Sequence, residues 1–180
     1  LRLVGSEMCI RDRLSPECNE RDAKHVEGAK PGMIYASGFS KLISGEEGLD
    51  IIIAHAQTRF PEWQERGDSA SAPVGTHLEI PADGVEEKNG RYRLPNGNYL
   101  EETASYYVMV QTKSGAYTPA LITMKSTQLS VSKKWNSMMK SVQIDDGKGG
   151  FAIPPMHGVV YNLQSNLQKN DKGSWYGWVV

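Results

Sequence analysis

The stretch SYYVMVQTKSGAYTPALITMKSTQLSVSKKWNSMMKSV, residues 105–142, changes its apolar period once, and this change decides the fold. Its first half holds two runs of aromatic and β-branched residues around the turn KSGA, a pattern typical of paired strands. In its second half the apolar residues recur at the spacing of one helix face, at Val131, Trp135, Met138, Met139 and Val142. The sequence therefore predicts two strands followed directly by one helix.

The segments that precede this stretch predict further β-structure. GLDIIIAHAQTRFPEW at 48–63 reads as one long strand, and we expect Pro61 to end its run. Shorter extended pieces are expected within 27–42 and 75–81. The two NG dipeptides within 82–103 are good turn formers and indicate a hairpin-like excursion.

The segment after the predicted helix completes the order of elements. DDGKGG at 145–150 is expected to end the helix, and HGVVYNLQSNLQKNDKGSWYGWVV at 157–180 reads as a hairpin whose turn is NDKG. Several strands, one helix and two last strands are the order of an OB-fold, a partly open barrel that binds oligonucleotides. We therefore expect a mainly β (β-rich α+β) fold, an OB-like partly open barrel with one helix before the last two strands. Other β-sandwich and α+β arrangements share that order.

The two ends of the chain suggest a fragment. LVGSEMCIRDR at 3–13 lacks any period of its own and resembles the translation of a transposase-type sequencing adapter, with a disordered natural leader as the alternative. At the other end GSWYGWVV stops within an apolar, aromatic run. We expect residues 1–13 to be an adapter artefact and 14–180 to be a single β-rich domain truncated at both ends.

Charge is distributed unevenly along the chain. Residues 14–103 carry 9 Lys and Arg against 16 Asp and Glu, whereas 104–180 carry 8 Lys against 3 Asp. A basic C-terminal half is a hint of contact with nucleic acid or another polyanion, although a solvated face is the commoner cause. No apolar run reaches the length that spans a bilayer, which predicts a soluble protein without a membrane partner.

The sequence carries no recognisable catalytic or cofactor motif. A phosphate-binding loop, a dinucleotide fingerprint, a zinc-protease motif and a nucleophile elbow are all missing, and the four histidines are scattered singly. With the first 13 residues set aside, Cys18 is the remaining cysteine, so no disulfide or cysteine metal site is expected. We expect no catalytic residues, no metal, no cofactor and no enzymatic activity.

Aromatic residues interleave with basic ones, the pairing that holds single-stranded nucleic acid by base stacking and phosphate contact. Five lysines are expected to neutralise phosphates: Lys133, Lys134, Lys140, Lys169 and Lys172. Three rings are expected to stack on bases, with three arginines beside them: Trp63, Tyr92, Trp175, Arg66, Arg91 and Arg93. The alternative is that the rings fill the barrel interior, and we favour it for Trp135 on the apolar helix face.

Four strings together carry a resemblance to a known kind of protein: LSPECNERDAKHVEGAKPGMIY, SYYVMVQT, TPALITMKSTQLSVSKKWNSMM and QKNDKGSWY. They resemble a poorly characterised family of tailed-bacteriophage proteins, over nearly all of 14–180. The resemblance implies a link to phage DNA replication and recombination. Together with the basic C-terminal half and the interleaved aromatic residues, it leads us to expect single-stranded DNA and phage replication proteins as partners in the host cytoplasm. Edge strands of a β-rich fold also make a homo-oligomer possible. We expect a non-catalytic single-stranded DNA-binding or accessory protein. A phage structural or assembly protein is the alternative.

Overall fold

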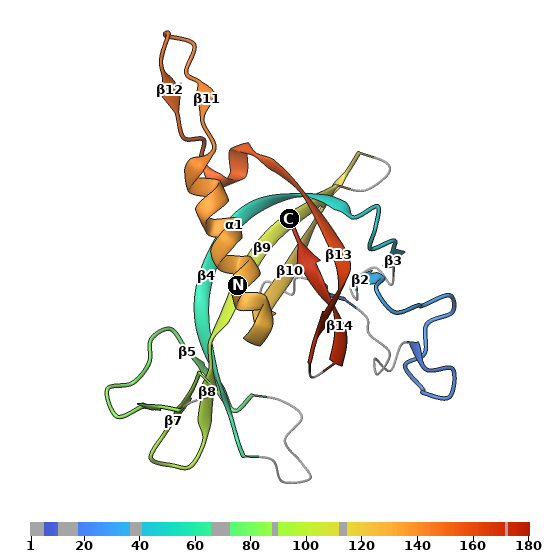
Figure 1. Ribbon diagram of the computed structural model, residues 1–180, viewed down its shortest axis with the longest axis vertical. Coiled ribbons are helices and arrows are strands. Elements are labelled where there is room, and N and C mark those ends of the chain that lie inside the picture. Colours follow the sequence, from blue (N-terminus) through green and yellow to red (C-terminus); the bar gives the residue numbers. More distant parts are fainter. Residues whose placement is uncertain are drawn as a thin grey trace.

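A computed structural model of the chain describes residues 6–10, 18–36, 41–65, 73–87, 90–111, 115–171 and 173–180. Its centre is an antiparallel sheet of three long strands, β4 (Leu49–Trp63), β9 (Thr103–Gln111) and β10 (Tyr117–Lys125) (Figure 1). From Tyr106 to Val110 in β9 and from Ala120 to Met124 in β10, buried side chains alternate with less buried ones, as the period of a half-buried strand requires. The two strands predicted around the KSGA turn are confirmed.

Three short strands extend the sheet beyond β10. β1 (Ser6–Ile10) runs parallel to β10, and β2 (Ile34–Ala36) and β3 (Lys41–Ile43) follow it in antiparallel order. Met8 of β1 is buried in the core. This strand lies within the segment that we expect to derive from an adapter, and that expectation stays a prediction.

A second, smaller set of strands gathers at the far end of β4. It comprises β5 (Gly75–His77), β6 (Val85–Glu86), β7 (Arg91–Arg93) and β8 (Tyr99–Glu101), which include the predicted hairpin-like excursion. The prediction that Pro61 ends the long strand is wrong, because β4 continues to Trp63. Pro61 lies between the part of β4 that pairs with β9 and the part that pairs with β8, so its missing N–H falls where the partner strand changes.

The predicted helix is confirmed and packs on the central sheet. A 3₁₀ turn, η3 (Ser126–Gln128), leads into α1 (Leu129–Ser141), and Ser126 makes the corner with a φ of 52°. Trp135 is 1% exposed, stacks on Tyr106 at 4.4 Å between ring centroids and meets Tyr161 edge-on at 5.6 Å. Trp135 is therefore a core residue, as we favoured.

The segment that ends the helix forms an arm that the sequence did not predict. β11 (Ile144–Asp145) and β12 (Phe151–Ala152) pair as a short hairpin that projects from the body of the molecule (Figure 1). Its turn is held by aspartate side chains: Asp145 accepts from the N–H of Gly147, and Asp146 accepts from those of Lys148 and Gly150. Strands of two residues are too short to produce a period in the sequence.

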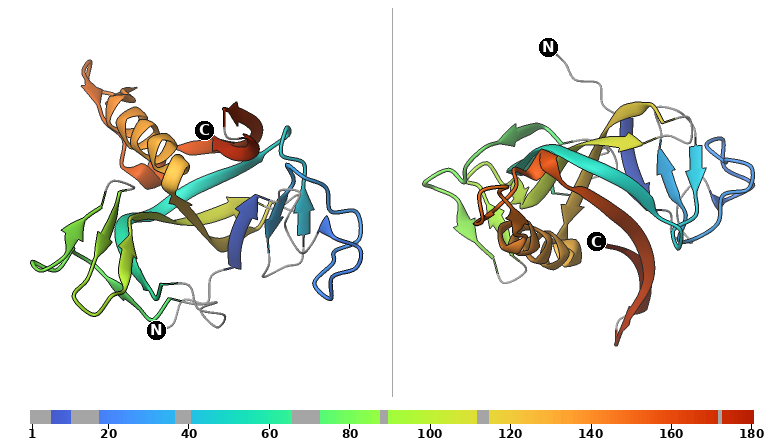
Figure 2. Two further views of the ribbon diagram at one scale, coloured as in Figure 1. Left: turned by 60° about the horizontal axis from the view of Figure 1, so that its bottom comes forward. Right: turned by 90° about the horizontal axis from the view of Figure 1, so that it is seen from above.

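The last two strands curl the sheet into an open half-barrel (Figure 2). After the 3₁₀ turn η4 (Met156–Gly158), β13 (Val160–Asn170) pairs with β4 through residues 160–163 and then leaves it to pair with β14 (Gly173–Val179). The buried apolar side chains of these strands join Trp135 in the core; they are Tyr161, Leu163 and Trp178. The expectation of a mainly β, partly open barrel with one helix before its last strands is confirmed.

Candidate nucleic-acid interface

The residues predicted to bind nucleic acid fall in three separate parts of the fold. Trp63, Arg91, Tyr92 and Arg93 lie in the small set of strands at the far end of β4. The lysines at 133, 134 and 140 lie on α1, and the residues at 169 and 175 lie on the β13–β14 hairpin. Two further predictions, Arg66 and Lys172, lie outside the described residues.

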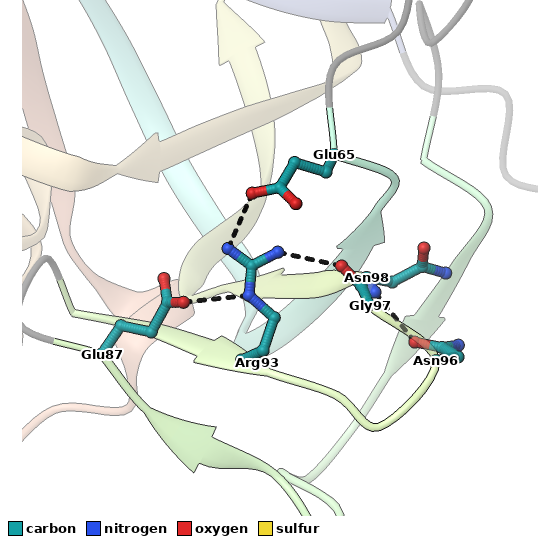
Figure 3. Close-up of polar contacts among 6 residues, drawn as sticks. All are labelled: Glu65, Glu87, Arg93, Asn96, Gly97 and Asn98. Carbon is teal, nitrogen blue, oxygen red and sulfur yellow. Dashed lines mark hydrogen bonds and ion pairs between the residues drawn. The ribbon is translucent and has the colours of Figure 1, made fainter.

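In the small set of strands, the positive charge of Arg93 is matched by carboxylates (Figure 3). Its Nε donates to Glu87 at 2.9 Å, one terminal nitrogen donates to Glu65 at 3.0 Å, and the other donates to the carbonyl of Gly97 at 2.9 Å. The hydrogen bond to Glu87 is the main cause that raises the pKa of Arg93 further above its usual value. Arg93 therefore stabilises the β7–β8 turn.

The other aromatic and basic side chains of this region also contact one another. The guanidinium of Arg91 lies 4.5 Å from the ring centroid of Tyr99, and Tyr92 meets Phe60 edge-on at 6.2 Å. Nζ of Lys125 lies 5.4 Å from the ring centroid of Trp63 and pairs with Glu101 at 3.3 Å. Contacts within the protein therefore explain why aromatic and basic residues interleave in this region. A role in nucleic-acid binding stays a prediction for Trp63, Arg91, Tyr92 and Arg93.

A half-buried carboxylate anchors the same strands. Glu62 accepts hydrogen bonds from the amides of Asn98 at 2.6 Å and Asn96 at 3.0 Å and pairs with Nε2 of His77 at 2.7 Å. Above all the bond from Asn98, followed by those from His77 and Asn96, lowers the pKa of Glu62 to about 2. This ionised carboxylate ties β4, β5 and the β7–β8 turn together.

The surface of α1 is basic and carries no carboxylate. Lys133, Lys134 and Lys140 are exposed, and the sequence contains no Asp or Glu from 103 to 144. Among the described residues, no ion pair involves any of these three lysines. Positive charge held on a rigid helix without internal partners is available to an external anion.

The β13–β14 hairpin lies on the same side of the sheet as α1 (Figure 2). Gln128, which precedes α1, accepts from the N–H of Trp178 at 2.8 Å and so links the start of the helix to β14. On this hairpin Lys169 is exposed opposite Ser174, and Trp175 is half-buried opposite Gln168. The structure thus brings α1 and the β13–β14 hairpin to one side of the half-barrel, and the register places Lys169 and Trp175 on opposite faces of that hairpin.

Beside α1 the structure contains a cleft that the sequence reasoning missed. Its volume is about 450 Å³, and it lies between the sheet, the last turns of α1 and the chain after β12. The side chains that line it include Tyr106, Asn136, Met139, Lys140, Pro154 and Met156. One signal was present in the sequence, because residues 136, 139 and 140 recur at i, i+3 and i+4 and share one side of a helix.

Hydrogen bonds fix the polar group at the base of this cleft. The hydroxyl of Tyr106 lies 2.7 Å from Oγ of Ser132, and its proton has two acceptors within reach, Oδ1 of Asn136 at 3.2 Å and the carbonyl oxygen of Ser132 at 3.3 Å. Burial raises the pKa of Tyr106, so its phenol stays neutral at physiological pH. Since Oδ1 of Asn136 is one of these acceptors, its amide nitrogen is left as the group that is able to donate to a ligand.

No helix among the described residues is long and apolar enough to cross a membrane.

Comparison with known proteins gives one family. No curated protein and no solved structure matches the chain. The model of the Pam3 phage gp34-like protein family matches residues 10–180, which agrees with the phage resemblance of the sequence. This match covers almost the whole chain, and the protein therefore belongs to the Pam3 phage gp34-like protein family.

Proposed function

We propose that this phage protein binds single-stranded DNA during replication or recombination, by occupancy and without catalysis. The observation that carries the proposal is the carboxylate-free α1, which has three exposed lysines and lies on the same side of the sheet as the β13–β14 hairpin. Lysines that neutralise phosphates release counterions, and this release supplies most of the affinity of such proteins for a strand. The proposal places the protein in the host cytoplasm, with phage replication proteins as further partners.

The hairpin adds an aromatic ring to this basic surface. Trp175 is half-buried, with its Nε1 turned into the protein and without a hydrogen-bond partner among the described residues. Lys169 projects from the neighbouring strand close to the hairpin turn. A ring held at its edge is a suitable platform for one base of a flexible DNA strand.

Fluorescence anisotropy of a labelled oligothymidine tests the proposal. We expect the triple variant Lys133→Ala, Lys134→Ala and Lys169→Ala to weaken binding by roughly tenfold or more at low salt, because each lost phosphate contact removes a counterion-release contribution. The matched control replaces three exposed cations of the N-terminal loop, Arg21, Lys24 and Lys30, with Ala. Equal affinities of the two triple variants would refute the assignment of the surface.

A second candidate function is assembly with another protein, because the β11–β12 arm exposes apolar side chains. Ile144 is 48% exposed, Phe151 76% and Ile153 58%. Large apolar side chains gathered on a projecting element are typical of a protein contact. Light scattering over a range of protein concentrations tests this candidate. Self-association that Phe151→Ser abolishes would favour an assembly role, and a monomer at all concentrations would count against a homo-oligomer.

A further inference from the structure

We propose that the cleft between α1 and the sheet accepts one nucleobase, while Lys140 holds the phosphate that adjoins it. This inference rests on the proposed function and adds a base-binding site to the basic surface. The nucleotide has two possible sources, a DNA strand or a free nucleoside monophosphate, and they share the same chemistry.

The size and lining of the cleft suit a flat, partly polar ring. Its volume of about 450 Å³ lies within the range of small-molecule sites. Met139, Pro154 and Met156 supply apolar surface, and methionine sulfur packs favourably against aromatic rings. Polar groups are the minority of the lining: Asn136 and Tyr106 meet on one side, and Gln57, Thr58 and Lys140 complete the polar set. Apolar walls with a small number of placed polar groups are typical of ligand sites.

The donor in the cleft is oriented before any ligand arrives. Oδ1 of Asn136 accepts from the hydroxyl of Tyr106, whose oxygen lies 2.7 Å from Oγ of the buried Ser132. Among the described residues, none accepts from the amide nitrogen of Asn136. Carbonyl oxygens and ring nitrogens of bases are acceptors that such an amide recognises. Every base carries such an acceptor, so the amide serves any of them, thymine included.

The cation lies where a phosphate would follow the base. Lys140 is one helical turn beyond Asn136 on the same side of α1, and it both lines the cleft and is exposed. Lys133, Ser137 and Lys140 recur at i, i+4 and i+7 and form a ridge along the helix. Lys134 lies about a third of a turn away from this ridge. A DNA strand whose phosphates follow the ridge of Lys133, Ser137 and Lys140 would place one of its bases at the cleft.

Three probes separate base binding from phosphate binding: an oligothymidine, a strand of equal length made of abasic sites, and thymidine monophosphate. We expect the native chain to bind the oligothymidine about tenfold or more tightly than the abasic strand, the range that stacking of a single base produces. We also expect Lys140→Ala to weaken binding of the oligothymidine more than Lys134→Ala does. Equal losses in these two variants would overturn the assignment of the phosphate to Lys140.

Two variants block the cleft without removing a lysine. Asn136→Asp keeps the acceptor for Tyr106 but replaces the donor with a negative charge, and Met156→Trp fills the cleft from an exposed position. The control Ser141→Asp adds the same charge on the far side of α1. We expect both cleft variants to lose most of the native preference for oligothymidine over the abasic strand and to unfold at the native temperature. The remaining preference is the contribution of Trp175, and the control should keep the full preference.

The outcomes distinguish this inference from the proposed function. If the native chain binds both strands equally, or if the cleft variants keep the full preference for oligothymidine, the base site is refuted and single-stranded DNA binding stands. If neither strand binds, the proposed function fails. In that case, saturable binding of thymidine monophosphate would show that the cleft binds a free nucleotide, provided that Met156→Trp abolishes this binding. If thymidine monophosphate does not bind either, the base site in the cleft is refuted together with DNA binding.

Discussion

The carboxylate of Glu62 makes the stability of the protein depend on pH in a way that one substitution isolates. Its pKa is about 2 in the folded chain and 4.5 when unperturbed, so the ionised form is favoured by folding. Stability from this group is fully present above the unfolded value and is lost as the pH falls toward the folded value. A difference of this size corresponds to roughly 3 kcal/mol in total, of which about 2 kcal/mol is lost between about pH 6 and about pH 3.

Glu62→Gln removes this dependence while keeping a side chain of similar shape and a carbonyl that accepts a hydrogen bond. Urea unfolding of the native chain and the variant gives the two free energies of unfolding at each pH. We expect the native chain to be the more stable at neutral pH and its advantage to shrink by about 2 kcal/mol at about pH 3. Glu86→Gln, an exposed carboxylate on β6, is the control and should show no such trend. A constant difference between native chain and Glu62→Gln at every pH would refute the reasoning.

Further predictions concern packing. Trp135→Ala should lower the free energy of unfolding by about 3–5 kcal/mol, since it removes a buried ring stacked on Tyr106, and Trp135→Phe by less. Calorimetric melts measure this loss, and a change below about 1 kcal/mol would contradict a core role. Gly32→Ala should also destabilise the fold, because Gly32 has a φ of +89° and an added Cβ would overlap the ring of Tyr176. Gly28→Ala is its control, with a similar positive φ but open space around it, so equal thermal shifts in the two variants would exclude the contact with Tyr176.

Local patterns in the sequence predicted most of the elements of the half-barrel. The change of period between 105 and 142 placed two strands and α1, and the NDKG turn placed the last hairpin. Local patterns do not show which distant segments pair with each other in the sheet. The change of partner along β4, which lets the strand continue through Pro61, is set by β8 and β9 some 40 residues later.

The candidate site was predicted only in part for the same reason. Exposed lysines on α1 follow from the helical period, which also assigns Trp135 to the core. In contrast, Arg93 of β7 contacts Glu65, which follows β4, and Glu87, which follows β6. These contacts form only when the three strands come together. The cleft depends on Tyr106 of β9 reaching Asn136 of α1, a contact across 30 residues of sequence. Residue types and spacing show which side chains are basic or aromatic, but not which of them pair with each other.

The salt dependence of oligothymidine binding tests the central claim most directly. The described lysines of the basic surface are Lys133, Lys134, Lys140 and Lys169. If all four contact phosphates, the logarithm of the association constant should fall with the logarithm of salt concentration with a slope of about −3. The triple variant that lacks three of these lysines should give a slope close to −1. Absence of binding at low salt by the folded chain, or a slope near zero in the native protein, would contradict the claim.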